Sequence, residues 1–238
     1  MDKINLRCGD YREQLAHVRA DLILTSPPYN IGSKSPRIDG FRKLGKYDPK
    51  SYGAIRDYAD SLPEDEYQDQ QAQFLIWCAD HLTERGIVVY NHKPRRKNKA
   101  LIHPLGWLSS ARVKERLTLM EEIVWDRGST HNHCDRMMWQ TTERLYVLRR
   151  AGSDYRFRNT SNLPHRSDLW RINRARSSHD GTFPLALARA IILAWSSDGD
   201  LVCDPYVGTG TPAIAALDAG RRSEGAENNR HRHARAQR

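Results

Sequence analysis

The stretch Asp204-Pro205-Tyr206-Val207-Gly208-Thr209-Gly210-Thr211 decides the fold class. It follows the apolar run 201–203 and precedes an alanine-rich segment at 212–217, an order that predicts a strand, a glycine-rich turn and a helix. Proteins of the α/β class bind nucleotide-like ligands at such turns, at the carboxyl ends of their strands. The glycines are not spaced as in dinucleotide-binding or phosphate-binding loops. We therefore expect a ligand with a cationic group near the Asp204 carboxylate.

Composition limits the class of protein. The chain has 238 residues, a net charge of +9 and an isoelectric point near 9.5, which favours a polyanionic partner, although charge alone fixes no specificity. Four cysteines without paired spacing indicate neither a disulfide framework nor a metal-binding pair, and favour a reducing compartment. Without a signal peptide or an apolar run of about 18 residues, the sequence predicts a cytoplasmic protein that does not span a membrane.

The remaining pattern predicts further strands and helices of an α/β sheet. We expect strands at 4–6, 21–25, 87–91, 121–125 and 142–148, of which the last two form a hairpin-like pair at the end of the sheet. We expect helices at 11–19, 64–82 and 184–195, with Gly86 closing the second of them. The segment 100–119 is ambiguous and includes a candidate helix.

A second turn follows the strand expected at 21–25 and reads Ser26-Pro27-Pro28-Tyr29-Asn30. Two prolines cannot continue a central strand, because they lack the backbone N–H that a ladder needs. They predict a rigid, extended loop at the carboxyl edge of the sheet. Taken alone, this motif is better explained by a simple proline turn than by a catalytic site.

Three polar segments stand apart from this pattern. Residues 31–63 read as a surface insertion loop, and residues 149–178 as a target-recognition segment rich in Arg, Asn and Ser. The basic loop at 92–99 is either a solvated charge run or a phosphate-contacting loop. The candidate residues for contacts with a polyanion are Lys93, Arg95, Arg96, Lys97, Arg166 and Arg171.

Together, the two turns resemble motifs of the amino-methyltransferases that modify exocyclic amines of DNA bases with S-adenosylmethionine. Residues 25–30 are similar to the catalytic motif, and residues 204–211 to the cofactor motif, with Tyr206 where Phe is common. Gly220-Arg221 followed by Glu227 resembles the next strand and its ribose-binding acid. The catalytic motif precedes the cofactor motif, which is the order of the family's β group.

This resemblance implies a fold, a domain organisation and a cofactor. The fold is a Rossmann-like methyltransferase fold: a mostly parallel sheet with helices on both faces and an antiparallel strand near one edge, in a single domain over residues 1–238. Asp204 would lie near the methionine amino group and sulfonium, Glu227 near the ribose, and Asp10 and Phe183 near the adenine. The implied S-adenosylmethionine-binding residues are Asp10, Phe183, Asp204, Pro205, Tyr206, Gly208, Thr209, Gly210, Thr211, Glu227 and Asn228.

The resemblance also implies a catalytic mechanism. An exocyclic amine is a poor nucleophile because its lone pair is delocalised into the ring, and two acceptors aimed at its hydrogens direct that lone pair toward the methyl group. The Ser26 hydroxyl and the Pro27 carbonyl would be these acceptors. Tyr29 would stack on a base that has left the duplex, and Pro28 completes the catalytic motif.

The target base is left open by the motif. Asp or Asn replaces Ser26 in many adenine enzymes and Ser is frequent in cytosine-N4 enzymes, whereas some small adenine enzymes share Ser-Pro-Pro-Tyr-Asn. Asn30 favours adenine N6, with cytosine N4 as the alternative. RNA or protein-glutamine methylation, and a catalytically inactive DNA-binding relative, are further alternatives. The implied partners are duplex DNA, a second copy of the chain in a homodimer and a restriction endonuclease.

The sequence Thr130-His131-Asn132-His133-Cys134 offers potential metal ligands. No second ligand pair has the spacing of a zinc site, and the context of an HNH nuclease is missing. We therefore expect no metal, and interpret this loop as lying near the target base or the DNA backbone.

Overall fold

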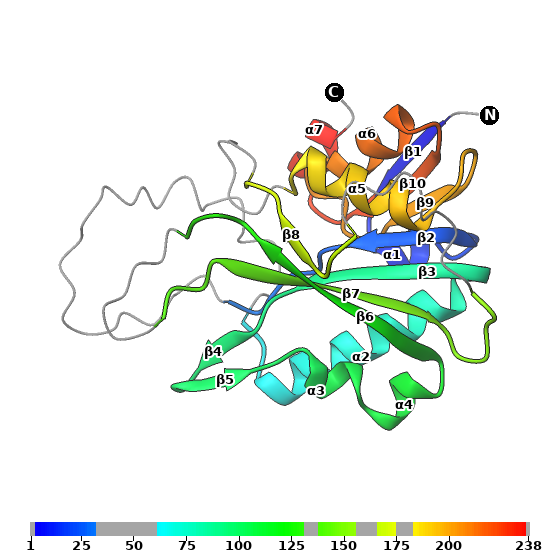
Figure 1. The fold of residues 1–238 in the computed structure, drawn as a ribbon. Helices are drawn as coiled ribbons and strands as arrows, with labels where there is room; N and C mark the ends of the chain where they lie inside the picture. The colour runs from blue at the N-terminus through cyan, green and yellow to red at the C-terminus, as the bar shows by residue number, and fades with distance from the viewer. Residues whose placement is uncertain (1–2, 32–60, 131–137, 156–165, 175–182, 237–238) are drawn as a thin grey trace.

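A computed structural model describes residues 3–31, 61–130, 138–155, 166–174 and 183–236. Eight strands form one sheet in the order β1-β10-β9-β2-β3-β7-β6-β8 (Figure 1). Their bounds are β1 Ile4–Cys8, β2 Ala20–Thr25, β3 Leu82–His92, β6 Leu117–Asp126, β7 Thr142–Arg150, β8 Leu169–Arg171, β9 Leu201–Asp204 and β10 Arg222–Glu227. Among these strands, β7 alone runs antiparallel to its neighbours. The expected mostly parallel sheet with an antiparallel strand toward one edge is confirmed.

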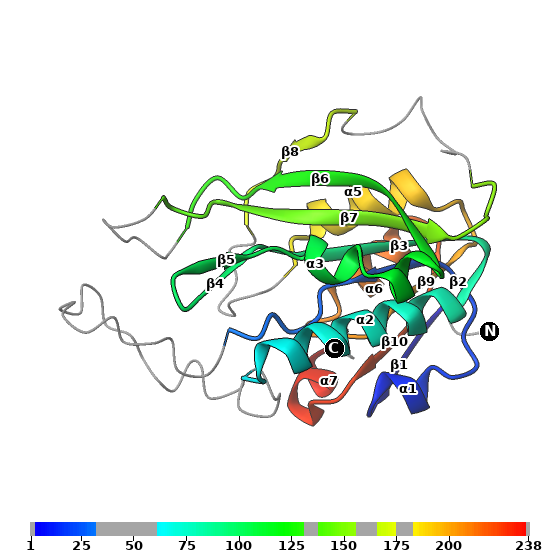
Figure 2. The same ribbon diagram turned by 90° about the horizontal axis from the view of Figure 1, so that it is seen from below.

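Helices cover both faces of this sheet (Figures 1 and 2). One face has α5 Leu185–Trp195 and α6 Thr211–Asp218. The other has α1 Tyr11–Gln14, α2 Glu64–Asp80, α3 Leu105–Leu108 and α4 Ala111–Lys114. The last helix, α7 Arg230–Ala236, contacts β1 and β10. A separate two-stranded hairpin is formed by β4 Arg95–Lys97 and β5 Ala100–Ile102.

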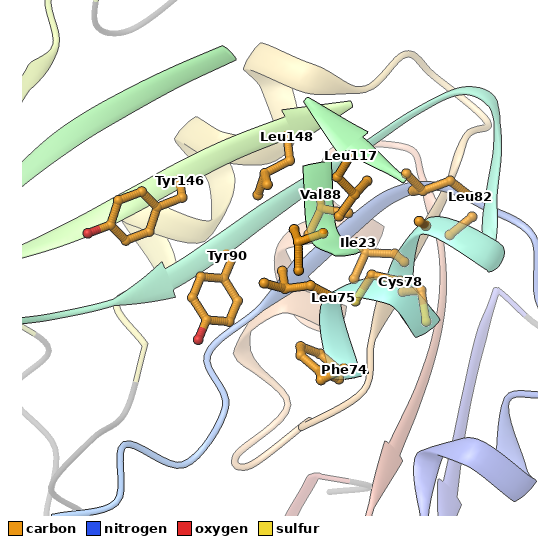
Figure 3. Packing of buried hydrophobic residues seen from close by; sticks show 14 of the residues in the cluster. Ile23, Phe74, Leu75, Cys78, Leu82, Val88, Tyr90, Leu117, Tyr146 and Leu148 are labelled. Carbon is orange, nitrogen blue, oxygen red and sulfur yellow. The ribbon is translucent and has the colours of Figure 1, made fainter. Parts of the chain in front are cut away.

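The central strands are apolar on both faces because each face packs against helices. Ile23 of β2 and Val88 of β3 pack with Phe74 and Leu75 of α2, as Figure 3 shows. Their strand neighbours point to the opposite face and pack against α5 and α6; these are Leu22, Leu24, Ile87 and Val89. Burying each such side chain contributes roughly 1.5–3 kcal/mol, which explains the continuous apolar runs in the sequence.

Two local expectations were wrong. The helix expected at 11–19 is a single turn, Tyr11–Gln14, which Asp10 caps by accepting the amide of Arg12 at 2.8 Å. Gly86 does not end a helix: α2 ends at Asp80, and Gly86 lies inside β3. A Cβ at Gly86 would lie 2.7 Å from the carbonyl oxygen of Ala20, so a glycine is needed there for close strand packing.

The basic segment after β3 is more ordered than expected. Instead of a simple loop it forms the β4–β5 hairpin, with Arg95 paired to Ile102. The ambiguous segment 100–119 contains β5, the short helices α3 and α4 and the start of β6. Across the described part of the chain, no helix has the length and apolar character required to cross a bilayer.

Candidate active site

The two motif loops leave the same edge of the sheet from adjacent parallel strands. β2 pairs with β9 through Leu22 with Val202 and Ile23 with Cys203. Ser26 follows the last residue of β2, and Asp204 is the last residue of β9. The juxtaposition of the two loops, on which the sequence interpretation depended, is therefore present.

The glycine turn after β9 is fixed to the end of β10. Gly208 and Gly210 have φ values of 56° and 80°, a backbone region that favours glycine. The Gly208 amide donates to the Glu227 carboxylate at 2.8 Å, and the Val207 amide donates to the Ala226 carbonyl at 3.1 Å. These hydrogen bonds fix the shape of the turn.

Asp204 is a buried carboxyl group within this turn. It is 4% exposed, and burial raises its pKa to about 7, against the opposing effects of the Tyr206 amide and the Thr25 side chain. The Tyr206 amide donates to one of its oxygens at 3.0 Å. A cationic group beside this carboxylate would offset the cost of burying its charge. The environment therefore fits a positively charged ligand.

Other expected cofactor residues lie around this turn. Glu227 is 1% exposed, and its second oxygen accepts the Asn229 amide at 2.9 Å. Asn228, between them, is exposed. Asp10 follows β1, whose neighbour is β10, and the Gly9 amide donates to the Glu227 carbonyl at 3.1 Å.

Two expected cofactor residues have aromatic packing partners. The Tyr206 ring contacts the rings of Phe74 and Tyr11, with centroids 5.2 and 5.4 Å away, so it anchors the turn to the α2 side of the core. The Phe183 ring lies before α5 and contacts Trp125 of β6, with centroids 6.1 Å apart. Both rings thus have a packing role independent of any ligand.

The catalytic loop centres on the Tyr29 hydroxyl. The Ser26 hydroxyl lies 3.0 Å from it, and the Asn91 and Glu143 side chains accept from it at 2.9 and 3.1 Å. Burial, followed by the charge of Glu143, raises the pKa of Tyr29 well above its ordinary value, so its phenol stays neutral. The ring lies beside His92, with centroids 4.4 Å apart.

A second hydrogen-bonded chain fixes the backbone of this loop. The Tyr67 hydroxyl of α2 donates to the Pro28 carbonyl at 2.8 Å and lies 2.7 Å from Nε2 of His92. Burial lowers the pKa of His92 to about 3, so its ring is neutral. On the other side of the His92 ring, Nδ1 lies 2.8 Å from the Lys93 carbonyl oxygen and 2.9 Å from the Lys93 amide nitrogen, so the ring is held from both sides. The Pro28 carbonyl is engaged by Tyr67 within the protein.

Asn30 ends the loop through backbone contacts. It adopts a φ of 54°, which asparagine tolerates better than most residues. Its side chain accepts the Leu62 amide at 2.7 Å and donates to the Leu62 carbonyl at 3.0 Å. Asn30 therefore joins the catalytic loop to the residues that precede α2.

The basic residues after β3 differ in position. Arg95 is 5% exposed, and its guanidinium binds Glu64 with contacts of 2.6 and 3.1 Å, so it is not placed for a direct phosphate contact. Arg96 is exposed, and Lys97 lies 3.5 Å from Glu64. The Lys93 ammonium lies 5.6 Å from the centre of the Tyr29 ring, at the catalytic loop.

Arg166 and Arg171 are exposed, and Arg171 belongs to the edge strand β8. Several sequence interpretations fall on residues outside the described ranges. These are most of the insertion loop at 31–63, the parts of the recognition segment at 156–165 and 175–178, and the segment with His131, His133 and Cys134. Within the described ranges, no group of three or more His, Cys, Asp or Glu side chains is arranged to hold a metal ion.

Comparison with known proteins identifies the family. A family model described as DNA methylase, of the N6/N4 type, matches residues 20–238. The chain belongs to this family. It is 37% identical to the type II methyltransferase M.SmaI of Serratia marcescens over 255 aligned positions, which cover 93% of this chain and 85% of that protein.

Other relatives are longer or more distant. The type II methyltransferase M.HpaI of Haemophilus parainfluenzae is 27% identical over 80% of this chain, and the chain spans 58% of its length. The fold matches PvuII DNA methyltransferase, a cytosine-N4-specific enzyme by its title, with a TM-score of 0.75 at 16% identity, covering 100% of this chain and 86% of that one. This last likeness shows a shared Rossmann-like methyltransferase fold.

The family motifs pointed to the two turns but not to the residues that support them. Asn91, Arg127, Glu143 and Tyr67 belong to the site by contact, and none was singled out from the sequence. The register of β3 against β7 places Asn91 opposite Leu145, beside the start of β7. For these supporting residues, the available sequence signal was the polar pair Asn91-His92 at the end of an apolar strand.

Proposed function

We propose that this chain transfers a methyl group from S-adenosylmethionine to the exocyclic amine of a base in duplex DNA. The observation that supports this most directly is the adjacency of two loops: the Ser26 loop after β2 and the Asp204 turn after β9. One contains the Ser26 hydroxyl, which would accept from an amine, and the other contains the buried Asp204 carboxylate, which would favour a cation. Membership of the DNA methylase family supports the same activity.

The residues of the glycine turn fit S-adenosylmethionine. When bound, this cofactor supplies an electrophilic methyl group on a sulfonium. Asp204 would accept from the cationic methionine end, because its buried carboxylate gains most from a nearby positive charge. The turn at Gly208 and Gly210 leaves room for close backbone approach, and Glu227 and Asp10 would bind the nucleoside end.

The Ser26 loop would orient the amine. Its hydroxyl accepts one amine hydrogen, and the Pro27 carbonyl is proposed as the second acceptor. Tyr67 holds the neighbouring Pro28 carbonyl, which fixes the direction of the backbone between them. No strong base is required, because the amine can lose its proton after transfer. Placement of the nucleophile in line with the methyl group then provides much of the rate.

The base is part of the proposal. Asn30 favoured adenine N6, but its side chain binds the Leu62 backbone, a role that does not depend on the base. Ser26 is then the remaining indicator, and it favours cytosine N4. Adenine N6 remains the second candidate, supported by 24% identity to the DNA adenine methyltransferase YhdJ of Escherichia coli over 93% of this chain.

Partners and location belong to the same proposal. The basic charge of +9 and the type II relatives support duplex DNA as substrate and a restriction endonuclease acting on the same site. Action on cellular DNA favours a cytoplasmic location. A homodimer is proposed from the β-group resemblance, and light scattering at micromolar concentration tests it.

The deciding experiment uses tritiated S-adenosylmethionine and duplex DNA, followed by digestion to nucleosides and mass spectrometry. We expect label in N4-methylcytosine; label in N6-methyladenine would reverse the choice of base. The variants Ser26→Ala and Tyr29→Ala combined should lose at least about 100-fold in rate, as sites do when acceptors or donors to the reacting group are removed. Ser109→Ala, on an exposed serine after α3, is the matched control. Full activity in the double variant would refute the assignment of the catalytic loop.

A further inference from the structure

Glu143 is a buried carboxylate of the site that the family motifs do not explain. It lies at the start of β7, opposite Trp125 of β6, and is 7% exposed. It is separated from Tyr29 by 114 positions in the chain, yet its Oε2 accepts from the Tyr29 hydroxyl at 3.1 Å. The carboxylate therefore reaches the catalytic loop from the far side of Tyr29.

The contacts around Tyr29 direct its hydrogen away from Ser26. Its phenol has a single hydrogen, and both Glu143 and Asn91 present oxygens to it. The Asn91 amide group is oriented by donating to the Arg144 carbonyl at 3.1 Å, so its oxygen must face Tyr29. Since Tyr29 donates to these acceptors, it cannot also donate to Ser26.

The Ser26 hydroxyl must then be the donor in its contact of 3.0 Å with Tyr29. A hydroxyl has one hydrogen and two lone pairs. Once its hydrogen points at Tyr29, the remaining capacity of Ser26 is that of an acceptor. An amine requires such a group, since its own hydrogens must be accepted.

We propose that Glu143 is a positioning residue that, through Tyr29, fixes the Ser26 hydroxyl as an acceptor for the target amine. This inference rests on the proposed function. Glu143 touches neither substrate nor cofactor in this proposal, and it acts by committing the Tyr29 hydrogen to a charged acceptor. Bonds to ionised acceptors are roughly twice as strong as neutral ones, so the carboxylate decides the direction of the chain.

Two cations accompany Glu143 in its buried position. Arg127 donates to its Oε1 at 2.8 Å and is itself held by the Gln140 carbonyl at 2.9 Å and the Thr141 carbonyl at 3.3 Å. Lys93 lies on the same side, where the charge of Glu143 opposes the lowering of the Lys93 pKa by burial. The arrangement keeps one carboxylate oxygen for Arg127 and the other for Tyr29.

The test is a double-mutant cycle with Glu143→Gln and Tyr29→Phe. An amide at 143 would turn its oxygen to Arg127 and its NH₂ to Tyr29, so the Tyr29 hydrogen would be left to Asn91 and a second donor would face the phenol oxygen beside the Ser26 hydroxyl. We expect kcat to fall about 10-fold or more, with the Kd for S-adenosylmethionine and for DNA within about 2-fold of wild type. In the Tyr29→Phe background, the same substitution should change kcat by less than about 2-fold.

The matched control is Glu122→Gln. Glu122 pairs with Arg144 at 3.1 Å on the same β6–β7 hairpin but does not reach Tyr29. It should leave kcat and both dissociation constants unchanged. A different result would overturn the inference: Glu143→Gln weakens cofactor binding, lowers Tm, and reduces kcat by the same factor with and without Tyr29→Phe. Glu143 would then have only a structural role.

A readout without catalysis separates this inference from the proposed function. If the wild-type chain transfers no methyl group, the proposed function fails first. NMR of ζ-¹³C-tyrosine, assigned with Tyr29→Phe, still reports the hydrogen bonding of the Tyr29 hydroxyl. Its resonance should shift in Glu143→Gln and stay in place in Glu122→Gln, and an unshifted resonance in both variants would overturn the inference.

Discussion

The backbone amide of Gly208 donates a hydrogen bond of 2.8 Å to the Glu227 carboxylate, which joins the glycine turn after β9 to the end of β10. The other carboxylate oxygen accepts the Asn229 amide at 2.9 Å. A carboxylate can accept from both the Gly208 and the Asn229 amide. A glutamine has only one oxygen, so its NH₂ group would face one of these N–H groups and leave that donor without an acceptor. The shape of the cofactor turn thus depends on both carboxylate oxygens of one buried side chain.

Glu227→Gln should therefore weaken cofactor binding by about 10-fold or more and lower the free energy of unfolding by about 1–3 kcal/mol, the cost of leaving a buried donor unsatisfied. Isothermal titration with S-adenosylmethionine and urea unfolding measure the two effects. Glu224→Gln is the control, because Glu224 lies on the same strand and pairs with Arg7 at its surface. Equal effects of the two substitutions would contradict this role for Glu227.

Asp204 should make the stability of the cofactor-free protein depend on pH. Burial raises its pKa from 3.8 to about 7, so the folded chain keeps a proton that the unfolded chain releases. The resulting stabilisation is fully present below pH 4 and is lost as the pH rises through about 7. Asp204→Asn should remove this contribution, and its free energy of unfolding should decline less between those two pH values. Identical slopes for the variant and wild type would show that Asp204 does not titrate in this range.

The same carboxyl group should couple cofactor binding to proton release. A cationic ligand favours the ionised form of Asp204, so binding below about pH 7 must displace a proton. Affinity for S-adenosylmethionine should fall as the pH drops below that value. Calorimetry in buffers of different ionisation enthalpy measures the released proton directly. Asp204→Asn should bind more weakly at pH 8 and release no proton.

The sequence was sufficient for the parts of the site that are local in the chain. A strand followed by a glycine turn and an alanine-rich helix, at 201–217, became β9, the turn and α6. The Ser26 loop was also predictable, because two prolines must end a central strand. The adjacency of β2 and β9 came from the family motif order, since the order of parallel strands in a sheet is not written in their periodicity.

The rest depended on tertiary contacts. Gly86 has the sequence pattern of a helix end, but a close approach to the Ala20 backbone explains it. Glu143 lies in an ordinary strand pattern, and only the β3–β7 register brings it to Tyr29. In the sequence, Arg95 and Arg96 are neighbours in one run of charges and cannot be told apart. In β4, alternation of the side chains buries Arg95 and exposes Arg96. Long-range pairing decides such roles, and periodicity does not report it.

Arg95 and Arg96 should consequently give opposite mutant phenotypes. The buried guanidinium of Arg95 pairs with the partly exposed Glu64 and lies 4.5 Å from the centre of the Tyr67 ring. Alanine at this position removes the main partner of Glu64, which keeps Lys97 at 3.5 Å, so the free energy of unfolding should fall by about 1–3 kcal/mol. Arg96→Ala should leave stability within about 0.5 kcal/mol, as exposed substitutions usually do.

For DNA binding, we expect Arg96→Ala to have the larger effect and Arg95→Ala the smaller. If Arg96 contacts one phosphate, its loss reduces the slope of log K against log salt by about 0.9. Fluorescence anisotropy with duplex DNA over a range of salt concentrations gives the slope, and thermal unfolding gives the stability. Arg96→Lys, which keeps the charge, should retain most of the slope. An unchanged slope for Arg96→Ala would remove Arg96 from the DNA-binding surface.

Gly225 should be as sensitive as any residue of the cofactor turn, although it lies in the middle of β10. A Cβ at this position would overlap the Val207 side chain and lie 2.9 Å from the Asp204 carbonyl oxygen. Both neighbours belong to the turn, so Gly225→Ala should displace it, costing about 1–3 kcal/mol of stability and weakening cofactor binding. Gly106→Ala is the matched control, because its Cβ would meet only Gln68 at an ordinary 3.6 Å within α3. There, alanine should raise the free energy of unfolding by about 0.5–1 kcal/mol. Opposite shifts of Tm in the two variants are expected, and a Gly225→Ala protein with wild-type Tm and cofactor affinity would show that the turn adapts to the added methyl group.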